Sequence, residues 1–173
     1  MLVISRKAGE SIVISENIRI TVVSIGSDKT IKIWTSDGRL VNTLVGHTAR
    51  IECLAVNREG TLIVSGSTDG GDLTLRLWDV EGRMLKILDR GKAYNTVAFS
   101  PDGKKIIAGT TGSEGKQVLC FSNTGEFLKK IELPSKIYTI SGLGFSPDGK
   151  KILAASGKDL WLLDAQTLSI VQS

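Results

Sequence analysis

The sequence predicts an all-β fold assembled from about four similar units, each built of four short antiparallel strands. Three observations on the 173 residues lead to this prediction. The heptapeptide Phe-Ser-Pro-Asp-Gly-Lys-Lys stands at 99–105 and returns unchanged at 145–151. A second series of short apolar runs, each closing on a bulky residue, repeats with nearly the same period. No stretch shows the sustained periodicity of an amphipathic helix.

Each heptapeptide is predicted to form the turn of a β-hairpin. Its proline fixes φ at one position and its glycine adopts positive φ without strain, which is what a tight turn requires. An apolar strand-like run follows each copy, at 106–109 and at 152–155, and a looser copy occupies 56–64. The three turn glycines are spaced 43 and 46 residues apart, at Gly60, Gly103 and Gly149.

A bulky residue closes the third strand expected in each unit. Trp34, Trp78 and Phe121 lie 44 and 43 residues apart, and each is followed four residues later by a glycine. In the fourth unit Leu163 takes this place, 42 residues after Phe121. Two independent markers therefore share one period, and a four-stranded meander of about 43 residues has the size of a β-propeller blade. In the second unit the strands are expected at about 51–56, 61–65, 73–78 and 84–88.

Three stretches carry a more specific pattern. They are Ser24-Ile-Gly-Ser-Asp28 before Trp34, Gly46-His47, and Ser65-Gly-Ser-Thr-Asp69 before Trp78-Asp79. With these motifs, residues 27–173 resemble the WD-repeat β-propellers, with blades expected up to about 45, at 46–90, at 91–134 and at 135–173. In that family a His, a Ser, an Asp and a Trp form a buried hydrogen-bonded network. The resemblance implies such a structural network at His47, Ser65, Asp69 and Trp78, and one without histidine at Ser24, Asp28 and Trp34.

The aspartate of the second unit has two candidates. The inserted residues Gly70-Gly71-Asp72 make Asp72 an alternative to Asp69. Units three and four lack both the histidine and the aspartate, so we expect apolar packing to hold them.

The first 26 residues carry a different pattern. Met1-Leu-Val-Ile-Ser-Arg-Lys-Ala-Gly-Glu-Ser-Ile-Val-Ile14, continued by 17–25, is similar to the first three strands of the carbon storage regulator family. That family consists of small dimeric proteins that bind messenger RNA and repress translation. The resemblance implies RNA contacts from Ile4, Arg6 and Lys7. The family's fifth strand, with its essential arginine, has no counterpart here, so we expect any RNA binding to be weak.

The two patterns meet near residue 26, and the junction predicts a hybrid first blade. A blade whose third strand is 31–34 needs two strands before it, and the regulator-like hairpin of 11–14 and 18–24 has the right size. Met1–Ile4 is then left as an extra edge strand. A natural fusion, a truncated gene and an engineered chimera all fit this arrangement.

Composition argues against catalysis. His47 is the single histidine, so it alone would have to serve a Ser–His or Cys–His mechanism, and no multi-histidine metal site is possible. No nucleophile or orienting partner is placed beside it, so we expect a non-enzyme with no catalytic residue, metal or cofactor. Cys53 and Cys120 stand in alternating apolar runs, which suits buried thiols in a reducing cytosol. No secretory signal or run of 18 apolar residues is found, so we expect a cytoplasmic protein outside the membrane.

The sequence therefore predicts a non-catalytic protein-interaction scaffold whose partner it does not name, with an RNA-binding regulator of translation as the alternative. The net charge of +4 is thinly spread and gives the alternative little support. Four blades are fewer than the about seven that WD-repeat propellers commonly close with. The apolar flanks near 12–23 and 153–163 are expected to be exposed, so we predict a homodimer that closes a ring of about eight blades.

Overall fold

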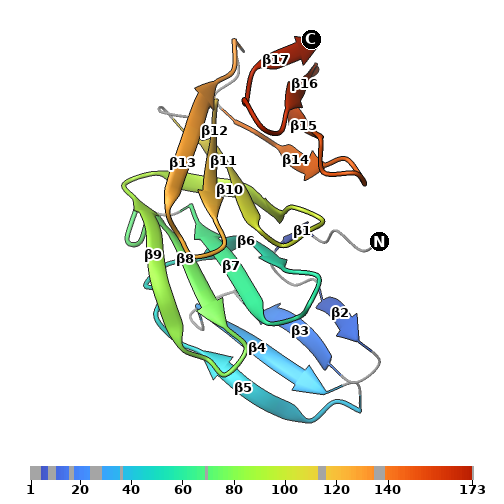
Figure 1. Cartoon of the computed structure of the whole chain (residues 1–173). Coiled ribbons are helices and arrows are strands. Elements are labelled where there is room, and N and C mark those ends of the chain that lie inside the picture. Colours follow the sequence, from blue (N-terminus) through green and yellow to red (C-terminus); the bar gives the residue numbers. More distant parts are fainter. Residues whose placement is uncertain are drawn as a thin grey trace.

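The computed structural model confirms the predicted fold class. It describes residues 5–7, 11–15, 18–23, 29–35, 37–68, 70–112, 116–134 and 139–172, and for 5–23 it describes the backbone alone. Within these ranges the chain forms seventeen strands and no helix. The strands form four antiparallel sheets that follow one another in an open stack and do not close into a ring (Figure 1).

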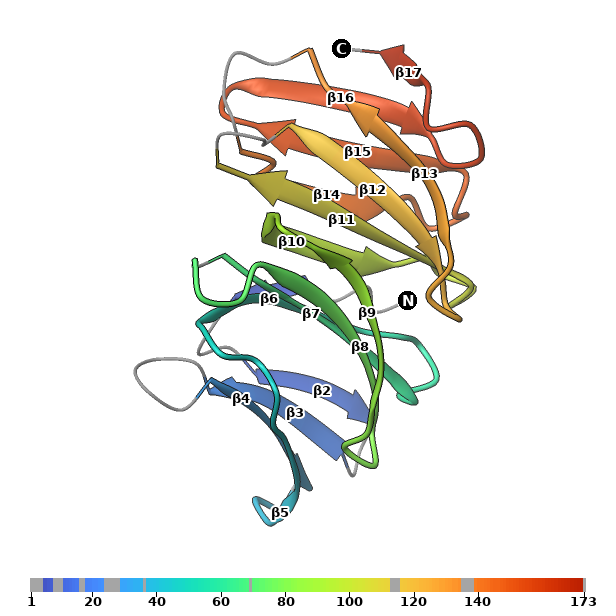
Figure 2. The same ribbon diagram turned by 90° about the vertical axis from the view of Figure 1, so that its left-hand side faces the viewer.

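Each sheet is a blade whose strands follow one another in chain order, and Figure 2 shows the four sheets one above the other. Blade one is β2 (Ser11–Ser15), β3 (Ile18–Val23), β4 (Thr30–Thr35) and β5 (Leu40–Leu44). Blade two is β6 (Ile51–Val56), β7 (Leu62–Ser67), β8 (Thr74–Asp79) and β9 (Met84–Arg90). Blade three is β10 (Ala93–Phe99), β11 (Lys105–Thr111), β12 (Gln117–Ser122) and β13 (Phe127–Glu132). Blade four is β14 (Gly142–Phe145), β15 (Lys151–Ser156), β16 (Asp159–Asp164) and β17 (Ile170–Gln172).

The first blade contains strands from both sides of the predicted junction near residue 26. Its strands β2 and β3 precede the junction, and its strands β4 and β5 follow it. The strands β3 and β4 pair over six residues, from Val23 opposite Thr30 to Ile18 opposite Thr35. Residues on the two sides of the predicted junction therefore share one continuous ladder.

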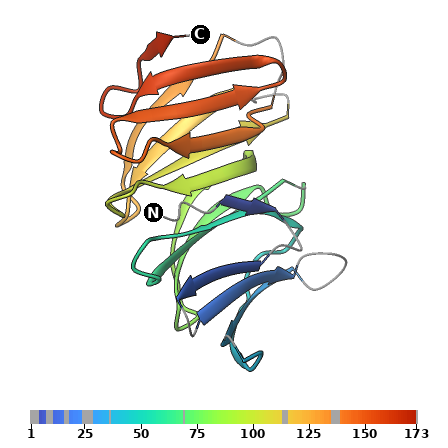
Figure 3. The same ribbon diagram turned by 90° about the vertical axis from the view of Figure 1, so that its right-hand side faces the viewer.

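The N-terminal strand that the structure describes pairs with blade two. The predicted edge strand Met1–Ile4 falls outside the described residues, but the adjoining β1 (Ser5–Lys7) pairs antiparallel with β6. It is therefore a fifth strand of blade two and not an extension of blade one (Figure 3). The register places Ser5 opposite Ala55 and Lys7 opposite Cys53. The strand β1 therefore supplies backbone partners to the side of β6 that does not pair with β7.

The repeated heptapeptides form the hairpin turns that their residues predict. In blade three the Ser100 hydroxyl donates to Asp102 (2.5 Å) and accepts from the Lys105 amide (2.9 Å). Gly103 has φ of +67°, a value that residues with a side chain rarely adopt. In blade four Ser146 makes the same pair of contacts.

Three apolar cores lie between consecutive blades. Because side chains alternate along a strand, each blade packs one face backward on the blade before it and the other forward on the blade after it. Ile106 of blade three packs backward against blade two, whereas Ile107 packs forward against blade four, and both are fully buried. Blades two and three are therefore covered on both faces, and blade four is covered on its backward face alone.

Candidate functional site

A chain of hydrogen bonds crosses the interior of blade two. The His47 ring lies in the loop before β6, with its Nε2 2.7 Å from the Ser65 hydroxyl on β7. The indole Nε1–H of Trp78 on β8 donates to the same hydroxyl oxygen at 2.8 Å. The three residues are almost fully buried, with exposed fractions of 6% for His47, 0% for Ser65 and 1% for Trp78. Residues 31 positions apart in the sequence therefore share one dry hydrogen-bonded unit.

Asp72 supplies the carboxylate of this unit. Its Oδ2 lies 2.7 Å from His47 Nδ1 and accepts a second hydrogen bond, also 2.7 Å, from the Thr48 amide. Its Oδ1 accepts from the Thr74 hydroxyl and from Arg76 Nη2 at 3.2 Å. Asp69, the other candidate, lies outside the described residues. The inserted glycines before Asp72 thus bring a carboxylate to the histidine.

The protonation of the pair follows from burial. Loss of hydration lowers the pKa of His47 to about 4, and it outweighs the opposite effect of the Asp72 charge. Burial alone would raise the pKa of Asp72, but hydrogen bonds from Thr74, Thr48 and His47 and the His47 charge lower it overall. Near neutral pH the ring is therefore uncharged. Its Nδ1–H donates to the Asp72 carboxylate and its Nε2 accepts from Ser65, which in turn accepts from Trp78.

Gly46 is the residue that lets the loop approach this closely. A Cβ at this position would lie 2.8 Å from Arg76 Nη1 and 3.0 Å from the Trp78 ring. A side chain here would push the loop, and with it His47, away from Ser65. The Gly-His motif therefore has a steric reason, because the glycine leaves room for the loop that carries His47 to Ser65.

The network expected in blade one falls mostly outside the described residues. Ser24 and Asp28 lie there, and Trp34 on β4 is partly buried. The strand register adds a residue that the motif did not indicate. Thr21 stands opposite Lys32 as Ser65 stands opposite Arg76, so Thr21 holds the register position of the network serine.

Blades three and four carry apolar residues at the same positions. Five residues after the turn glycine, where blade two has Ser65, they have Ala108 and Ala154, both fully buried. Where blade two has Trp78, they have Phe121 and Leu163. The indole donor and the hydroxyl acceptor are thus absent together, so neither blade buries half of the pair.

A different polar cluster lies where blade two leads into blade three. The hydroxyl of the buried Tyr94 bonds to Asp89, and Lys92 Nζ donates to the same carboxylate oxygen at 2.8 Å. Burial and the neighbouring carboxylate raise the pKa of the Tyr94 phenol, so the hydroxyl stays protonated and donates. The predicted motifs did not include this cluster. A signal was present in the spacing, since Glu132 lies 43 residues after Asp89 and Tyr138 lies 44 residues after Tyr94.

The described residues hold neither a reactive thiol nor a metal-binding cluster. Cys53 and Cys120 are buried free thiols, and burial raises the pKa of both well away from the thiolate form. In the part of the chain that the structure describes, no group of three or more His, Cys, Asp or Glu side chains is arranged to hold a metal. No helix there has the length and apolar character that crossing a membrane requires.

The residues predicted to contact RNA are only partly placed. Ile4 lies outside the described residues, and Arg6 and Lys7 lie in β1, opposite Leu54 and Cys53 of β6. One edge of this strand is therefore already paired within the chain.

Comparisons with known proteins agree with both resemblances. Residues 1–34 match the model of the global regulator protein family, CsrA, and residues 38–79 match the WD domain, G-beta repeat. Small ribosomal subunit protein RACK1y of Oryza sativa subsp. japonica is 37% identical over 94 residues, 54% of this chain and 27% of that protein. Cross-pathway control WD-repeat protein 2 of Flammulina velutipes is 37% identical over 90 residues, 51% of this chain and 28% of that protein.

The match is partial on both sides. The aligned part of the chain spans little more than a quarter of the length of these curated relatives. Together with the four described blades, the matches show a chain that joins a segment similar to the global regulator family to WD-repeat sequence.

Proposed function

We propose that the protein is a non-catalytic interaction scaffold of the cytoplasm and that the blade-two network braces it. The observation that carries this proposal is the burial of the network. The His47 and Asp72 side chains are 1% and 0% exposed, and their polar atoms bond to one another and to neighbouring protein groups. A histidine held this way stiffens the loop before β6 but does not meet a substrate. The loops at the two ends of the blades are then left to engage partners.

The first partner to test is the small ribosomal subunit, because one relative is named as a protein of that subunit. Co-sedimentation with purified small subunits at physiological salt is expected to carry the protein into the pellet. A control protein of similar mass and a pI near 9.1 measures binding that is due to basic charge alone. His47→Ala, assayed below its melting temperature, is expected to bind as the wild type does. Binding no stronger than the control removes this partner, and loss of binding in the folded variant would show that the network is more than a brace.

RNA binding is the second candidate function. Two observations favour it, namely the family match over residues 1–34 and the place of Arg6 and Lys7 in an ordered strand. An electrophoretic mobility shift with an RNA that carries a GGA loop, the element the regulator family reads, is expected to show weak binding that falls steeply with salt. Arg6→Ala and Lys7→Ala are expected to weaken it. A tight, salt-resistant and GGA-specific complex would instead make RNA regulation the main function.

Two further parts of the interpretation remain proposals. One is the division of the chain into a regulator-like segment, 1–26, that completes blade one, and WD-repeat blades over 27–173. The other is self-association into a homodimer. The sequence suggests two stacks that close a ring of about eight blades.

A further inference from the structure

The outer strand of blade three exposes more of its length than the outer strands of blades one and two. Its first four residues, Phe127, Leu128, Lys129 and Lys130, are all exposed, and the two apolar ones have exposed fractions of 55% and 48%. The strands β5 and β9 expose only their first two and first three residues before their side chains become partly buried. The strand β13 therefore presents an apolar pair and a basic pair side by side.

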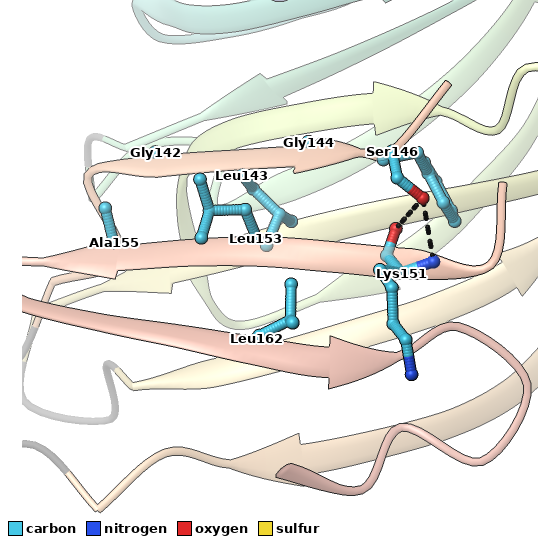
Figure 4. A pocket seen from close by; sticks show the side chains of 9 residues that line it. Gly142, Leu143, Gly144, Ser146, Lys151, Leu153, Ala155 and Leu162 are labelled. Carbon is cyan, nitrogen blue, oxygen red and sulfur yellow. Dashed lines mark hydrogen bonds between the residues drawn. The ribbon is translucent and has the colours of Figure 1, made fainter. Parts of the chain in front are cut away.

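One edge of β13 is also open. In the described residues β13 is the last strand of its sheet and pairs with β12 alone, so it lies at the outside of the stack (Figure 1). An edge strand presents unpaired N–H and C=O groups to which an extended chain can add. This exposure does not depend on where the chain ends, because apolar cores cover both faces of blade three. In contrast, the groove of about 380 Å³ along β14 and β15 opens on the last described blade (Figure 4).

The charge around this edge is basic. Beside the two lysines of the exposed stretch, Lys86 of β9 approaches the turn before β13, since a Cβ on Gly125 would lie 2.6 Å from the Lys86 side chain. The acidic residue within β13, Glu132, lies 3.9 Å from Lys116, which offsets its charge. The three lysines outweigh Glu126, the acidic residue of the turn before the strand. The open edge of β13 therefore attracts negative charge.

Lysines on an edge strand act on any strand that could add to it. Between two molecules of one kind, such like charges keep the edges apart and oppose aggregation. The same charges discriminate among other partners, because they repel a basic strand and attract an acidic one. Residues that stand directly opposite in an antiparallel pair lie close enough for opposite charges to stabilise the pairing and like charges to weaken it. Apolar residues gain in the same way opposite Phe127 and Leu128.

We propose that the open edge of β13 binds an extended acidic segment of a partner protein by strand addition. The segment pairs antiparallel with β13, as β12 does on the other side. In that direction two acidic residues lie opposite Lys130 and Lys129, and the two apolar residues that follow them lie opposite Leu128 and Phe127. This inference rests on the scaffold function proposed above and adds the outer side of blade three to the loops at the ends of the blades as a surface for partners.

Fluorescence anisotropy with two labelled peptides and the 173-residue chain tests this edge. The peptide Thr-Glu-Glu-Val-Val-Thr is expected to bind about 10-fold more tightly than Thr-Lys-Lys-Val-Val-Thr, because two opposed pairs change from like to opposite charge. Lys129→Glu combined with Lys130→Glu is expected to reverse this order. The matched control combines Arg58→Glu with Lys150→Glu, which make the same change of charge at exposed hairpin turns of blades two and four and should keep the order. Circular dichroism establishes that both double variants are folded.

Two modified peptides separate strand addition from simple attraction between charges. The acidic peptide is N-methylated on its odd or on its even residues, and only one of these sets of N–H groups faces β13 in an added strand. One version should therefore lose binding and the other should keep it. Equal binding of both versions, or equal effects of the β13 variant and the control variant, overturns strand addition at this edge. No binding of the acidic peptide at millimolar concentration also overturns it, whereas the small-subunit experiment above decides the scaffold function separately.

Discussion

Blade two and blade four have the same four-stranded backbone but different means of holding it. Blade two buries a histidine, a serine, an aspartate and a tryptophan that bond to one another. Blade four has Ala154 and Leu163 at the serine and tryptophan positions and is packed by the apolar core that it shares with blade three. The two blades also differ in coverage, since among the described residues blade two is packed on both faces and blade four on its backward face alone.

This difference shows that the polar network is one of two consistent solutions to the same packing problem. A buried indole N–H needs an acceptor, and a buried hydroxyl needs partners, so these residues occur together or not at all. Blade four keeps neither at these two positions, although it buries the Trp161 and Ser156 side chains elsewhere. In blade two, hydrogen bonds of defined geometry connect the loop before β6 to the sheet. Apolar packing is less directional than such hydrogen bonds. The following substitutions test this contrast, beginning with the largest expected effect.

Removal of the central aromatic residue should separate the two blades most clearly. We expect Trp78→Ala to lower the free energy of unfolding by about 4 kcal/mol, because a fully buried ring is lost and the Ser65 hydroxyl loses a donor. Leu163→Ala in blade four should cost about 2–3 kcal/mol, since it creates a smaller cavity and leaves no polar group unpaired. Urea denaturation followed by circular dichroism measures both values. Equal costs in the two blades would show that the hydrogen bonds add nothing to packing.

Acid should weaken blade two through its histidine. The pKa of His47 is about 4 in the folded chain and 6.5 in an unfolded one, so between these values the unfolded chain binds the proton more tightly. Stability is therefore expected to fall as the pH falls from 6.5 toward 4, by up to about 3 kcal/mol. The adjacent Asp72 carboxylate and Arg76 act on the same ring in opposite directions, the first raising and the second lowering its pKa.

Urea midpoints of the wild type and His47→Gln at pH 7, 6, 5 and 4.5 measure this effect. The variant is less stable at pH 7 but lacks the titrating ring, so its midpoint should change less across the window. If the urea midpoints of the wild type and the variant change by the same amount between pH 7 and pH 4.5, His47 is not buried in its neutral form.

A double-mutant cycle can give blade two the residues of blade three at these two positions. Ser65→Ala leaves the Trp78 N–H and the His47 Nε2 without their partner, and Trp78→Phe leaves the Ser65 hydroxyl without the indole donor. The combination reproduces the alanine and phenylalanine of blade three, so it should cost less than the sum of the single changes. We expect a coupling free energy of about 1–2 kcal/mol. Strict additivity in thermal or urea unfolding would mean that the hydrogen bond between the two side chains contributes no stability.

The sequence predicted some of these features and not others, for physical reasons. The repeat period predicted the number of blades. The resemblance to the WD-repeat family implied the network at His47, Ser65 and Trp78, which lie within hydrogen-bond distance. It left Asp69 and Asp72 open, because an insertion in a loop changes which carboxylate reaches the ring. It did not predict the strand Ser5–Lys7, because the pairing of β1 with β6 joins residues about fifty positions apart and no local pattern encodes it.

The smallest effect should come from Leu153 of blade four, whose counterpart in blade three is the covered Ile107. Ile107→Ala in blade three should cost about 2–4 kcal/mol, because Ile107 is fully buried against blade four. Leu153→Ala, at the equivalent position, should cost about 1 kcal/mol or less when unfolding is measured well below micromolar concentration, since half of the side chain already meets water. Repeating the measurement at high protein concentration sharpens the comparison. If two copies meet through blade four, the wild type gains stability with concentration and Leu153→Ala gains less, so the cost of the substitution grows. A cost that is independent of concentration would mean that water, and not a second copy, covers Leu153.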